Sequence, residues 1–363
     1  MTDRAARHIV IDGRELVGRP TGVGRYLMGL LTRWATGPAL AHRFTVIVPG
    51  AVPAELAALA PRIGTHQLAA DAIGTRFEQF ALPGVIRGLG ADVFFAPAYT
   101  APLGTPCAFV VAIHDLSYFA HPSWFAWREG LRRRWLTKAS ARRASKITTL
   151  SEFSAGEITR YLGVPRSRIE IVPPGSPSVL SETAGRREPL VLYAGTLLAR
   201  RRIEETIEAF ALVAAHVHGA RLVLVGEDRS TPSIDPMAIA ERAGVARQVE
   251  WRRYIPEQAL SDLYNRARAF VFISDYEGFA LTPMEALAHG VPVVLEDTAV
   301  AREVYGSGAA LVAPTPAAIA AALLPLLTDE DANQSAVARG VARFDQFSWA
   351  RSAATLLRVL EEA

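Results

Sequence analysis

The sequence predicts two doubly wound α/β units in series, each built on a parallel β-sheet. Short apolar runs alternate with longer amphipathic segments, a pattern typical of parallel strands covered by helices on both faces. At 363 residues, half of them apolar, the chain also has the length for two domains of roughly 150 residues each. The runs expected to form strands are HIVID, RFTVIVP, ADVFFAP, AFVVAIHD, KITTLS and IEIVPP in the first unit, and LVLYAG, RLVLVG, VEWRRYI, AFVFIS and VPVVLE in the second.

A proline-rich segment separates the two sets of strands. In VPPGSPSVLSETAGRREP, prolines interrupt both the helical and the strand period, and glycines and serines fill the gaps. We therefore expect an N-terminal domain at 1–176, a linker at 177–188 and a second domain at 189–346. The remaining residues, 347–363, are expected to form a helix with Ser348 as its N-cap.

Charge, cysteine content and hydropathy exclude several classes of protein. The 39 Lys and Arg exceed the 36 Asp and Glu only slightly, so we expect no nucleic-acid partner. A single cysteine, Cys107, permits no disulfide framework and fits a reducing compartment. There is no apolar signal-peptide region and no uninterrupted run of about 18 apolar residues. We expect a cytoplasmic protein, or one peripheral on the cytoplasmic face of the inner membrane.

Residues that follow the strands are the first candidates for a site, because open α/β sheets bind ligands at the carboxyl ends of their strands. After the first strand, Gly22 and Gly24 open a helix in GRPTGVGRYLMGLL. Such a turn could hold a phosphate at the helix N-terminus or simply connect a strand to a helix. It matches neither the three-glycine dinucleotide pattern nor the Walker pattern, so both interpretations stay open.

Two further groups follow strands. His114 ends AFVVAIH, where it is either a packed histidine or a catalytic one. Arg200, Arg201 and Arg202 stand in the turn after LVLYAG, where they are either solvated or able to grip a pyrophosphate through bidentate contacts.

The stretch SDYEGFALTPMEALAHGVPVV carries two glutamates between a strand and a helix. Thr282 as N-cap, Pro283 at the first helical position and Glu285 at the third would form a capping box, which gives Glu285 a structural role. Glu277 lies in the preceding loop, where a carboxylate has no evident structural duty. We expect both carboxylates to face a binding cleft.

These motifs carry a family resemblance. EGFALTPMEALAHGVPVV, with its two glutamates eight positions apart, resembles the signature of the retaining glycosyltransferases of family four. The resemblance covers nearly the whole chain, because TGVGRY, VVAIHDLSYFAHPSW, ITTLSEFSAGEI, IVPPG, LYAGTLLARR, IPEQALSDLYNRA and a final FSW occur in order.

The resemblance implies a GT-B architecture, two Rossmann-like domains facing a cleft, with the last helix returning to the first domain. It implies transfer of a hexose, mannose or similar, from a GDP- or UDP-linked donor to a saccharide or lipid-linked acceptor in cell-surface glycan synthesis. No metal or other cofactor is expected. The first domain would bind the acceptor and the second the nucleotide sugar.

The resemblance also assigns roles to residues. Glu285 would hydrogen-bond the ribose, Glu277 and His114 would lie at the transferred sugar as catalytic residues, and Arg200 and Arg201 would hold the pyrophosphate. The remaining donor-binding residues would be Gly22, Gly24, Gly278, Phe279, Ala280 and Leu281.

Some positions depart from the family pattern, and other functions compete with transfer. Arg201 stands where many relatives have lysine, Thr196 where others have arginine, and Ala280 where glycine is frequent, and these positions bear on the identity of the donor. Asp329 and Asp331 resemble a metal-binding pair of a GT-A enzyme, but helix capping explains them better. A retaining glycosidase would need no arginine turn. The main alternatives are a sugar-nucleotide epimerase of the same fold and an inactive homologue that serves as a binding protein.

One basic segment, WFAWREGLRRRWLTKASARR, is a separate candidate. From residue 127 to 143 it holds seven basic residues and one acid, with Trp124, Trp127, Leu131 and Trp135 at helical spacing. Either the tryptophans pack on the sheet and the arginines are only solvated, or the helix rests on an anionic membrane near a lipid-linked acceptor. The residues expected to contact the acceptor or the membrane are Arg128, Arg132, Arg133 and Arg134.

Overall fold

The computed structural model describes residues 6–18, 21–38, 41–176 and 187–363. The chain divides into two compact units. The first contains residues up to Gly175 together with Ser348–Ala363, and the second contains Ser176–Phe347. Most of the expected linker, 177–186, lies outside the described residues.

The first unit is built on a sheet of seven parallel strands in the order β3-β2-β1-β4-β5-β6-β7. The strand order reverses between β1 and β4, and such a switch point is where doubly wound sheets bind ligands. The strands are β1 His8–Asp12, β2 Arg43–Pro49, β3 Ile63–Leu68, β4 Val93–Ala96, β5 Ala108–Ala112, β6 Lys146–Thr149 and β7 Ile169–Ile171.

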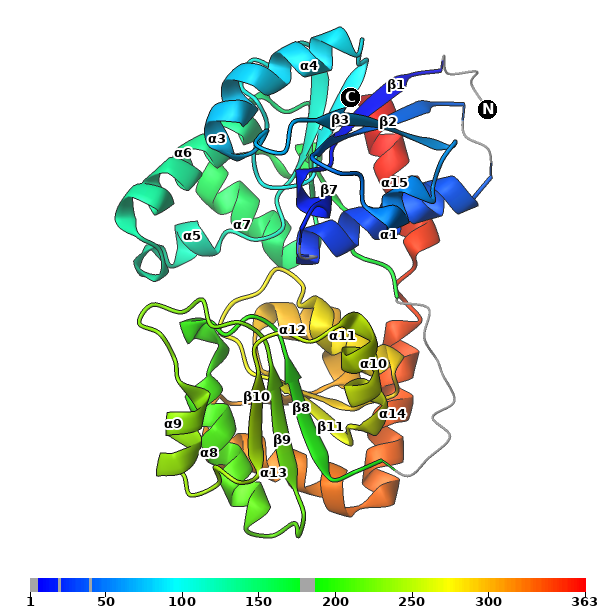
Figure 1. Ribbon diagram of the computed structural model, residues 1–363. Coiled ribbons are helices and arrows are strands. Elements are labelled where there is room, and N and C mark those ends of the chain that lie inside the picture. Colours follow the sequence, from blue (N-terminus) through cyan, green and yellow to red (C-terminus); the bar gives the residue numbers. More distant parts are fainter. Residues whose placement is uncertain (1–5, 19–20, 39–40, 177–186) are drawn as a thin grey trace. The chain divides into compact units, whose positions relative to one another are not determined.

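Helices cover both faces of this sheet (Figure 1). On one face, α1 (Gly22–Thr36) packs against the last helix, α15 (Trp349–Glu362), as expected for a terminal helix that returns to the first domain. On the other face, an apolar core joins α4 (Leu82–Gly88), α6 (Trp127–Arg143) and α7 (Glu152–Leu162) to the strands. The shorter helices are α2 Ala54–Ala57, α3 Gly74–Arg76 and α5 Ser117–Ala120.

The second unit has a six-stranded parallel sheet in the order β10-β9-β8-β11-β12-β13. Its order reverses between β8 and β11, which are hydrogen-bonded neighbours through the Val191–Ala269 register. The loops that leave the carboxyl ends of these two strands therefore meet. The strands are β8 Leu190–Ala194, β9 Arg221–Val225, β10 Val249–Arg252, β11 Ala269–Phe272, β12 Val293–Glu296 and β13 Ala310–Val312.

Helices also cover both faces of the second sheet (Figure 1). One face carries α8 (Ile203–Ala214), α9 (Pro236–Arg242) and α13 (Pro316–Thr328), and α13 packs against α8. The other carries α10 (Glu257–Arg266), α11 (Leu281–Ala288) and α14 (Glu330–Phe344), while α12 (Ala299–Val304) follows β12. The Asp329 side chain accepts a hydrogen bond from the backbone N–H of Ala332 at 3.1 Å and caps α14, so its interpretation as a helix cap is confirmed.

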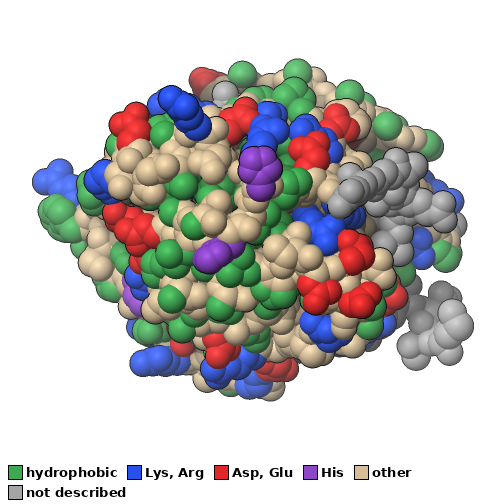
Figure 2. Space-filling model, turned by 90° about the horizontal axis from the view of Figure 1, so that it is seen from below, with side chains coloured by type: hydrophobic (Ala, Val, Ile, Leu, Met, Phe, Trp, Pro, Cys, Tyr) green, Lys and Arg blue, Asp and Glu red, His purple; other side chains and the backbone are tan. Residues whose placement is uncertain are grey.

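The surface mixes charges of both signs on the face drawn in Figure 2, where Lys and Arg alternate with Asp and Glu among uncharged atoms. The small positive excess of the chain is therefore not gathered on that face. Any strongly basic region has to be sought on particular elements.

Candidate active site

The switch point of the second sheet brings together an arginine turn and a carboxylate loop. Arg200 and Arg201 lie in the 3-10 turn Ala199–Arg201 after β8, and Glu277 lies in the loop after β11. Arg201 Nε donates to Glu277 Oε1 at 2.9 Å, and Arg200 Nε lies 3.9 Å from the same oxygen. All three side chains are 14% exposed. Residues 76 positions apart thus form one partly buried ionic cluster.

Neighbouring groups hold this cluster in place. Ser274 Oγ donates to Glu277 Oε1 at 3.0 Å, and Arg201 Nη1 donates to the carbonyl of Thr196 at 2.8 Å. The Arg201 guanidinium also lies 4.9 Å from the ring centroid of Phe272. Burial by itself would lower the pKa of Arg201, but the Glu277 carboxylate outweighs it and the pKa is raised. The arginine is therefore permanently charged and fixed in orientation, as a group that binds an anion should be.

The backbones of the two loops are also joined. Arg200 Nε donates to the carbonyl of Tyr276 at 3.1 Å, and the N–H of Asp275 donates to the carbonyl of Arg200 at 3.0 Å. Arg202 turns away from this pair: its Nε binds Asp275 at 2.6 Å and its Nη1 binds Glu205 at 3.0 Å. Arg202 therefore connects the loops, while Arg200 and Arg201 border the site.

Two glycines allow the loops after β8 and β9 to approach each other. A Cβ atom on Gly226 would lie 2.0 Å from the carbonyl oxygen of Gly195, which is far too close. Both residues have a φ near +150° that L-residues rarely adopt, namely +152° at Gly195 and +149° at Gly226. The arginine turn is thus positioned by a close backbone contact.

The capping box expected around Glu285 is wrong. Helix α11 begins at Leu281 with Ala280 as its N-cap, so Thr282 and Pro283 lie inside the helix and Glu285 comes one position after its first turn. Instead of capping the helix, Glu285 accepts a hydrogen bond from the Tyr264 hydroxyl at 3.3 Å. The helix starts early because Ala280 adopts a φ of 66°, and the hydroxyl of Tyr305 donates to its carbonyl.

The remaining donor-binding candidates in this loop connect Glu277 to α11. Phe279 is buried and packs edge-on against Phe347, with ring centroids 5.3 Å apart. Its side chain is therefore part of the core, and only its backbone could reach a ligand. Gly278 is also buried, whereas Ala280 and Leu281 are half-buried.

Sequence reasoning missed Glu296, the last residue of β12. Burial and the nearby Asp275 raise the pKa of Glu296 to about 7, and its buried Oε2 has no hydrogen-bond partner among the described residues. Glu296 could have been found from the sequence, because it ends the run VPVVLE and ligands bind at the carboxyl ends of parallel strands.

In the first unit, His114 is buried just after β5. Its Nε2 lies 2.7 Å from the carbonyl of Pro97, so this nitrogen carries the proton. The rings of Tyr26 and Tyr99 meet the imidazole edge-on at 5.3 and 5.6 Å. Burial lowers the pKa of His114, and its Nδ1 has no partner in the part of the chain that the structure describes. The histidine is a neutral imidazole with one acceptor nitrogen unused.

The two glycines expected to contact the donor open α1, as predicted. Gly22 is the first residue of the helix, and the Thr21 hydroxyl caps it by accepting from the N–H of Gly24 at 2.9 Å. A Cβ on Gly24 would lie 2.3 Å from the carbonyl oxygen of Glu15. Gly24 is therefore required for packing, and its contact with a phosphate stays a prediction.

A polar cavity of about 480 Å³ lies at the switch point of the first sheet. It extends from the residues that follow β1 to those that follow β4, and α6 forms another wall. Arg14 bridges two of its carboxylates, at 2.6 Å from Asp12 and 2.7 Å from Glu78. The lining combines carboxylates with Tyr99 and Thr137, which carry hydroxyls, and so offers the kinds of acceptor and donor that a saccharide needs.

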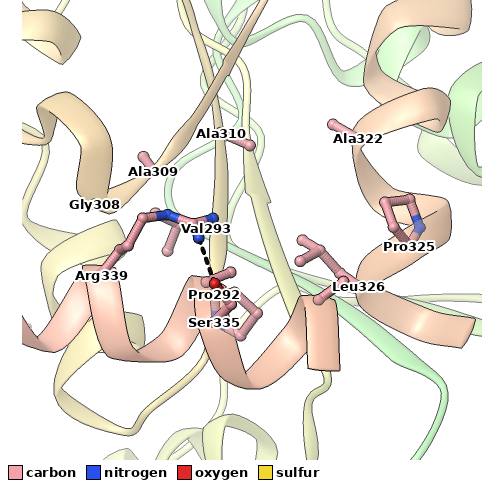
Figure 3. Close-up of a pocket in the computed structure, with 12 residues that line it drawn as sticks. Pro292, Val293, Gly308, Ala309, Ala310, Ala322, Pro325, Leu326, Ser335 and Arg339 are labelled. Carbon is pink, nitrogen blue, oxygen red and sulfur yellow. Dashed lines mark hydrogen bonds between the residues drawn. The ribbon is translucent and has the colours of Figure 1, made fainter. Parts of the chain in front are cut away.

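A second cavity, of about 350 Å³, lies in the second unit between β12, β13, α13 and α14 (Figure 3). Pro292 and Ala310 place it at the amino ends of the strands, opposite the arginine turn. Its lining is mainly alanine and proline, and its Arg339 donates to Ser335 Oγ at 2.7 Å (Figure 3). Neither its position nor its lining matches the candidate site.

The described residues contain no group of three or more His, Cys, Asp or Glu side chains arranged to hold a metal ion. Within the same residues, no helix has the length and apolar character needed to span a bilayer.

The two sheet orders and the polar cluster at each switch point define a two-domain protein of the GT-B class. The family model for "Glycosyltransferase Family 4" matches residues 20–177, and the family model for "Glycosyl transferases group 1" matches residues 181–342. The chain belongs to the group 1 glycosyltransferases of the GT-B fold, which confirms the resemblance seen in the sequence.

Curated relatives include two bacterial mannosyltransferases. O-antigen chain mannosyltransferase B of Escherichia coli is 31% identical over 66% of this chain and 66% of its own length. GDP-mannose:cellobiosyl-diphosphopolyprenol alpha-mannosyltransferase of Xanthomonas campestris is 28% identical over 72% of this chain and 70% of its own. A D-inositol 3-phosphate glycosyltransferase of Segniliparus rotundus is 29% identical, and this chain covers only 51% of its length.

Solved structures show the same fold over almost the whole chain. Sucrose-phosphate synthase from Thermosynechococcus elongatus has a TM-score of 0.73 at 17% identity and covers 97% of this chain and 98% of its own. HepE of Anabaena, in complex with UDP and glucose, has a TM-score of 0.73 at 17% identity and covers 98% and 100%.

Proposed function

We propose that the protein is a retaining hexosyltransferase that moves mannose, or a similar hexose, from a nucleotide diphosphate sugar to a saccharide or lipid-linked acceptor. The ionic cluster of Arg200, Arg201 and Glu277 at the switch point of the second sheet carries this proposal. Family membership and the names of the mannosyltransferase relatives support the reaction and the choice of sugar.

The arginines supply what the leaving group needs. Transfer breaks the bond between the anomeric carbon and the phosphate oxygen and forms a bond from that carbon to an acceptor hydroxyl oxygen. Negative charge develops on the departing diphosphate, and the acceptor hydroxyl passes its proton to an oxygen of that diphosphate. Arg200 and Arg201 are charged and held in place before the reaction, so they stabilise that charge without reorganising. We propose that this chemistry needs no metal.

The remaining groups would orient the donor. Glu285, held by the Tyr264 hydroxyl, would accept hydrogen bonds from the ribose, and Glu277 would contact the sugar ring. The unused Nδ1 of His114 would accept a hydrogen bond from a sugar hydroxyl. Because the pKa of this histidine is lowered, it is suited to positioning the sugar and not to carrying a positive charge.

We further propose that the protein works in the cytoplasm or on the cytoplasmic face of the inner membrane, in the synthesis of a cell-surface glycan. The relative from Xanthomonas campestris is named for a diphosphopolyprenol acceptor. A lipid-linked acceptor would require the enzyme to reach a membrane surface.

Thermal shift with a panel of nucleotides tests donor binding. GDP, UDP and their hexose conjugates should raise the melting temperature, with equal shifts in the presence of a chelator, whereas NAD should not. A ligand at a hundred times its dissociation constant stabilises a protein by about 2.7 kcal/mol, which such an assay resolves. A strict requirement for manganese in donor binding, or stabilisation by NAD alone, would reject the proposal.

A further inference from the structure

The first unit exposes large apolar side chains on two neighbouring segments. Phe80 is 83% exposed and Ile73 60%, and on α6 Trp127 is 70% and Trp135 61% exposed, with Leu131 exposed between them. The two segments are adjacent, because Arg132 of α6 donates a hydrogen bond to Thr75 Oγ1. We define these two segments, Ile73–Phe80 and Trp127–Trp135, as the docking face.

The orientation of α6 rejects the idea that its tryptophans pack on the sheet. Trp127, Leu131 and Trp135 recur every four residues and so share one face of the helix, and that face points to solvent. The side toward the core instead carries Gly130, Leu136, Thr137, Ser140 and Ala141. Trp124 does not belong to the stripe, since it lies in the preceding turn and stacks on His121 with ring centroids 4.0 Å apart.

Basic side chains flank the exposed aromatic residues. Arg128 and Arg132 are exposed beside them, and the Arg128 guanidinium lies 5.2 Å from the ring centroid of Trp127. Glu129 is the one acid on the helix, and Arg132 and Arg133 both bind it, at 2.5 and 2.7 Å. Arg134 differs from the others: it is half-buried and donates to the Tyr118 carbonyl at 3.3 Å. Its predicted role at the surface therefore loses support.

We infer that the docking face seats the first unit on a bilayer surface rich in anionic lipid. Soluble proteins rarely leave several large aromatic side chains exposed in one place without a partner for them. Tryptophan prefers the boundary between headgroups and acyl chains, and arginine can bury its stem there while its charge meets lipid phosphate. Each basic residue near an anionic surface adds to the attraction. This combination of aromatic and basic residues fits a bilayer better than it fits an apolar protein partner.

The docking face adjoins the polar cavity of the first unit. Ile73, Thr75, Arg132 and Arg133 belong to both. This part of the inference rests on the proposed function: the saccharide of a lipid-linked acceptor would enter the cavity while its lipid stays in the bilayer. The shared arginines stand at the border, where the phosphates between lipid and sugar would pass.

Vesicle flotation tests the docking face directly. The full-length protein should float with vesicles of phosphatidylglycerol and phosphatidylcholine in equal parts, stay down with phosphatidylcholine alone, and be released as salt rises. Two variants should each bind these vesicles about tenfold or more weakly. The aromatic variant combines Phe80→Ser, Trp127→Ser and Trp135→Ser, and the basic variant combines Arg128→Gln and Arg132→Gln. All of these side chains are exposed on described segments, so the variants should fold.

Matched controls remove similar groups from the second unit. Tyr254→Ser removes another exposed aromatic side chain, and Arg221→Gln with Arg242→Gln removes two other exposed charges. Both should float like the unmodified protein. Equal flotation of the docking-face variants and these controls would overturn the inference. So would self-association that disappears in the aromatic variant without any vesicle binding, because the face would then join two copies of the chain.

Donor binding separates this inference from the proposed function. The docking-face variants should keep the full thermal shift with the nucleotide sugar that stabilises the unmodified protein. Flotation without any donor binding would support the face and reject the transferase proposal. Donor binding without flotation would support the transferase proposal, reject the docking face and indicate a soluble acceptor.

Discussion

Replacing Glu277 by glutamine tests whether Glu277 contacts the donor sugar while Arg200 and Arg201 bind the diphosphate. The substitution keeps an acceptor for Ser274 and Arg201 but removes the negative charge that lies 2.9 Å from Arg201 and 3.9 Å from Arg200. The ion pair becomes a hydrogen bond from a charged arginine to a neutral amide oxygen, which should cost about 1 to 2 kcal/mol in the free energy of unfolding. Two partly buried arginines are then left without their shared carboxylate.

The two halves of the donor should respond in opposite ways. Because the arginines gain positive potential, the affinity for the nucleoside diphosphate alone should stay the same or rise, by up to about tenfold. Sugar transfer should fall by about a hundredfold or more, since the group proposed to contact the ring has lost its charge.

Calorimetric titration with the nucleoside diphosphate and a transfer assay measure these two quantities. Glu204→Gln is a suitable control, because Glu204 is 56% exposed and forms an ion pair with Arg242 on the surface of α8 and α9. A tenfold loss of nucleoside diphosphate affinity in a folded Glu277→Gln protein would contradict this prediction. It would mean that Glu277 serves the nucleotide and not the sugar.

Three further predictions concern the same unit. Glu285→Gln should weaken nucleotide binding by about 1 to 3 kcal/mol in a titration, and unchanged affinity would reject the ribose contact and return Glu285 to a structural role that includes the hydrogen bond from Tyr264. The pKa of Glu296 is about 7 in the folded protein against a usual 4.5, so the stability it contributes is complete below pH 4.5 and is lost as the pH rises to 7. Glu296→Gln, which mimics the neutral acid, should raise the free energy of unfolding by about 1 to 2 kcal/mol at pH 8 and by little at pH 4.5, and equal denaturation curves at pH 8 would contradict the shift. Ala280→Gly should stabilise the protein by roughly 1 kcal/mol in denaturant unfolding, since glycine adopts a φ of 66° without strain, and a loss of stability would show that the methyl group packs usefully.

The sequence predicted the strands wherever apolar residues form a continuous run, and it missed two edge strands. In β3, IGTHQL carries polar residues because only part of this edge strand is buried. At one edge of the second sheet, the three residues of β13 are all only half-buried, so no buried apolar run marks this strand. Edge strands lack the buried two-sided environment that the pattern detects.

Strand ends indicated most of the site, but not how its members meet. Arg201 and Glu277 are in contact because β8 lies beside β11, and this order cannot be read from local periodicity. The start of α11 was misplaced because Ala280 takes a positive φ, a conformation that alanine rarely adopts. The hydroxyl of Tyr305, which lies 25 positions further along the chain, donates a hydrogen bond to the Ala280 carbonyl.

The basic helix shows a different limit. The spacing of the tryptophans predicts that they share one face of α6. It does not say whether that face packs on the sheet or is exposed to solvent. The structure settles that choice through small residues such as Gly130 and Ser140, which let the helix lie close to its neighbours and turn the tryptophans outward. A pattern of large apolar residues alone does not say which side of a helix is buried.

The anomeric outcome of sugar transfer tests the central proposal most directly. The protein would be incubated with an α-linked nucleotide hexose and a lipid extract as the source of acceptor, and proton NMR would follow the anomeric signal while released nucleoside diphosphate is counted. We predict one released nucleoside diphosphate for each new α-glycosidic bond, also in the presence of a chelator. Both signals should be lost in Arg200→Gln. A β-linked product, or conversion of the donor into another nucleotide sugar without release of nucleoside diphosphate, would contradict it.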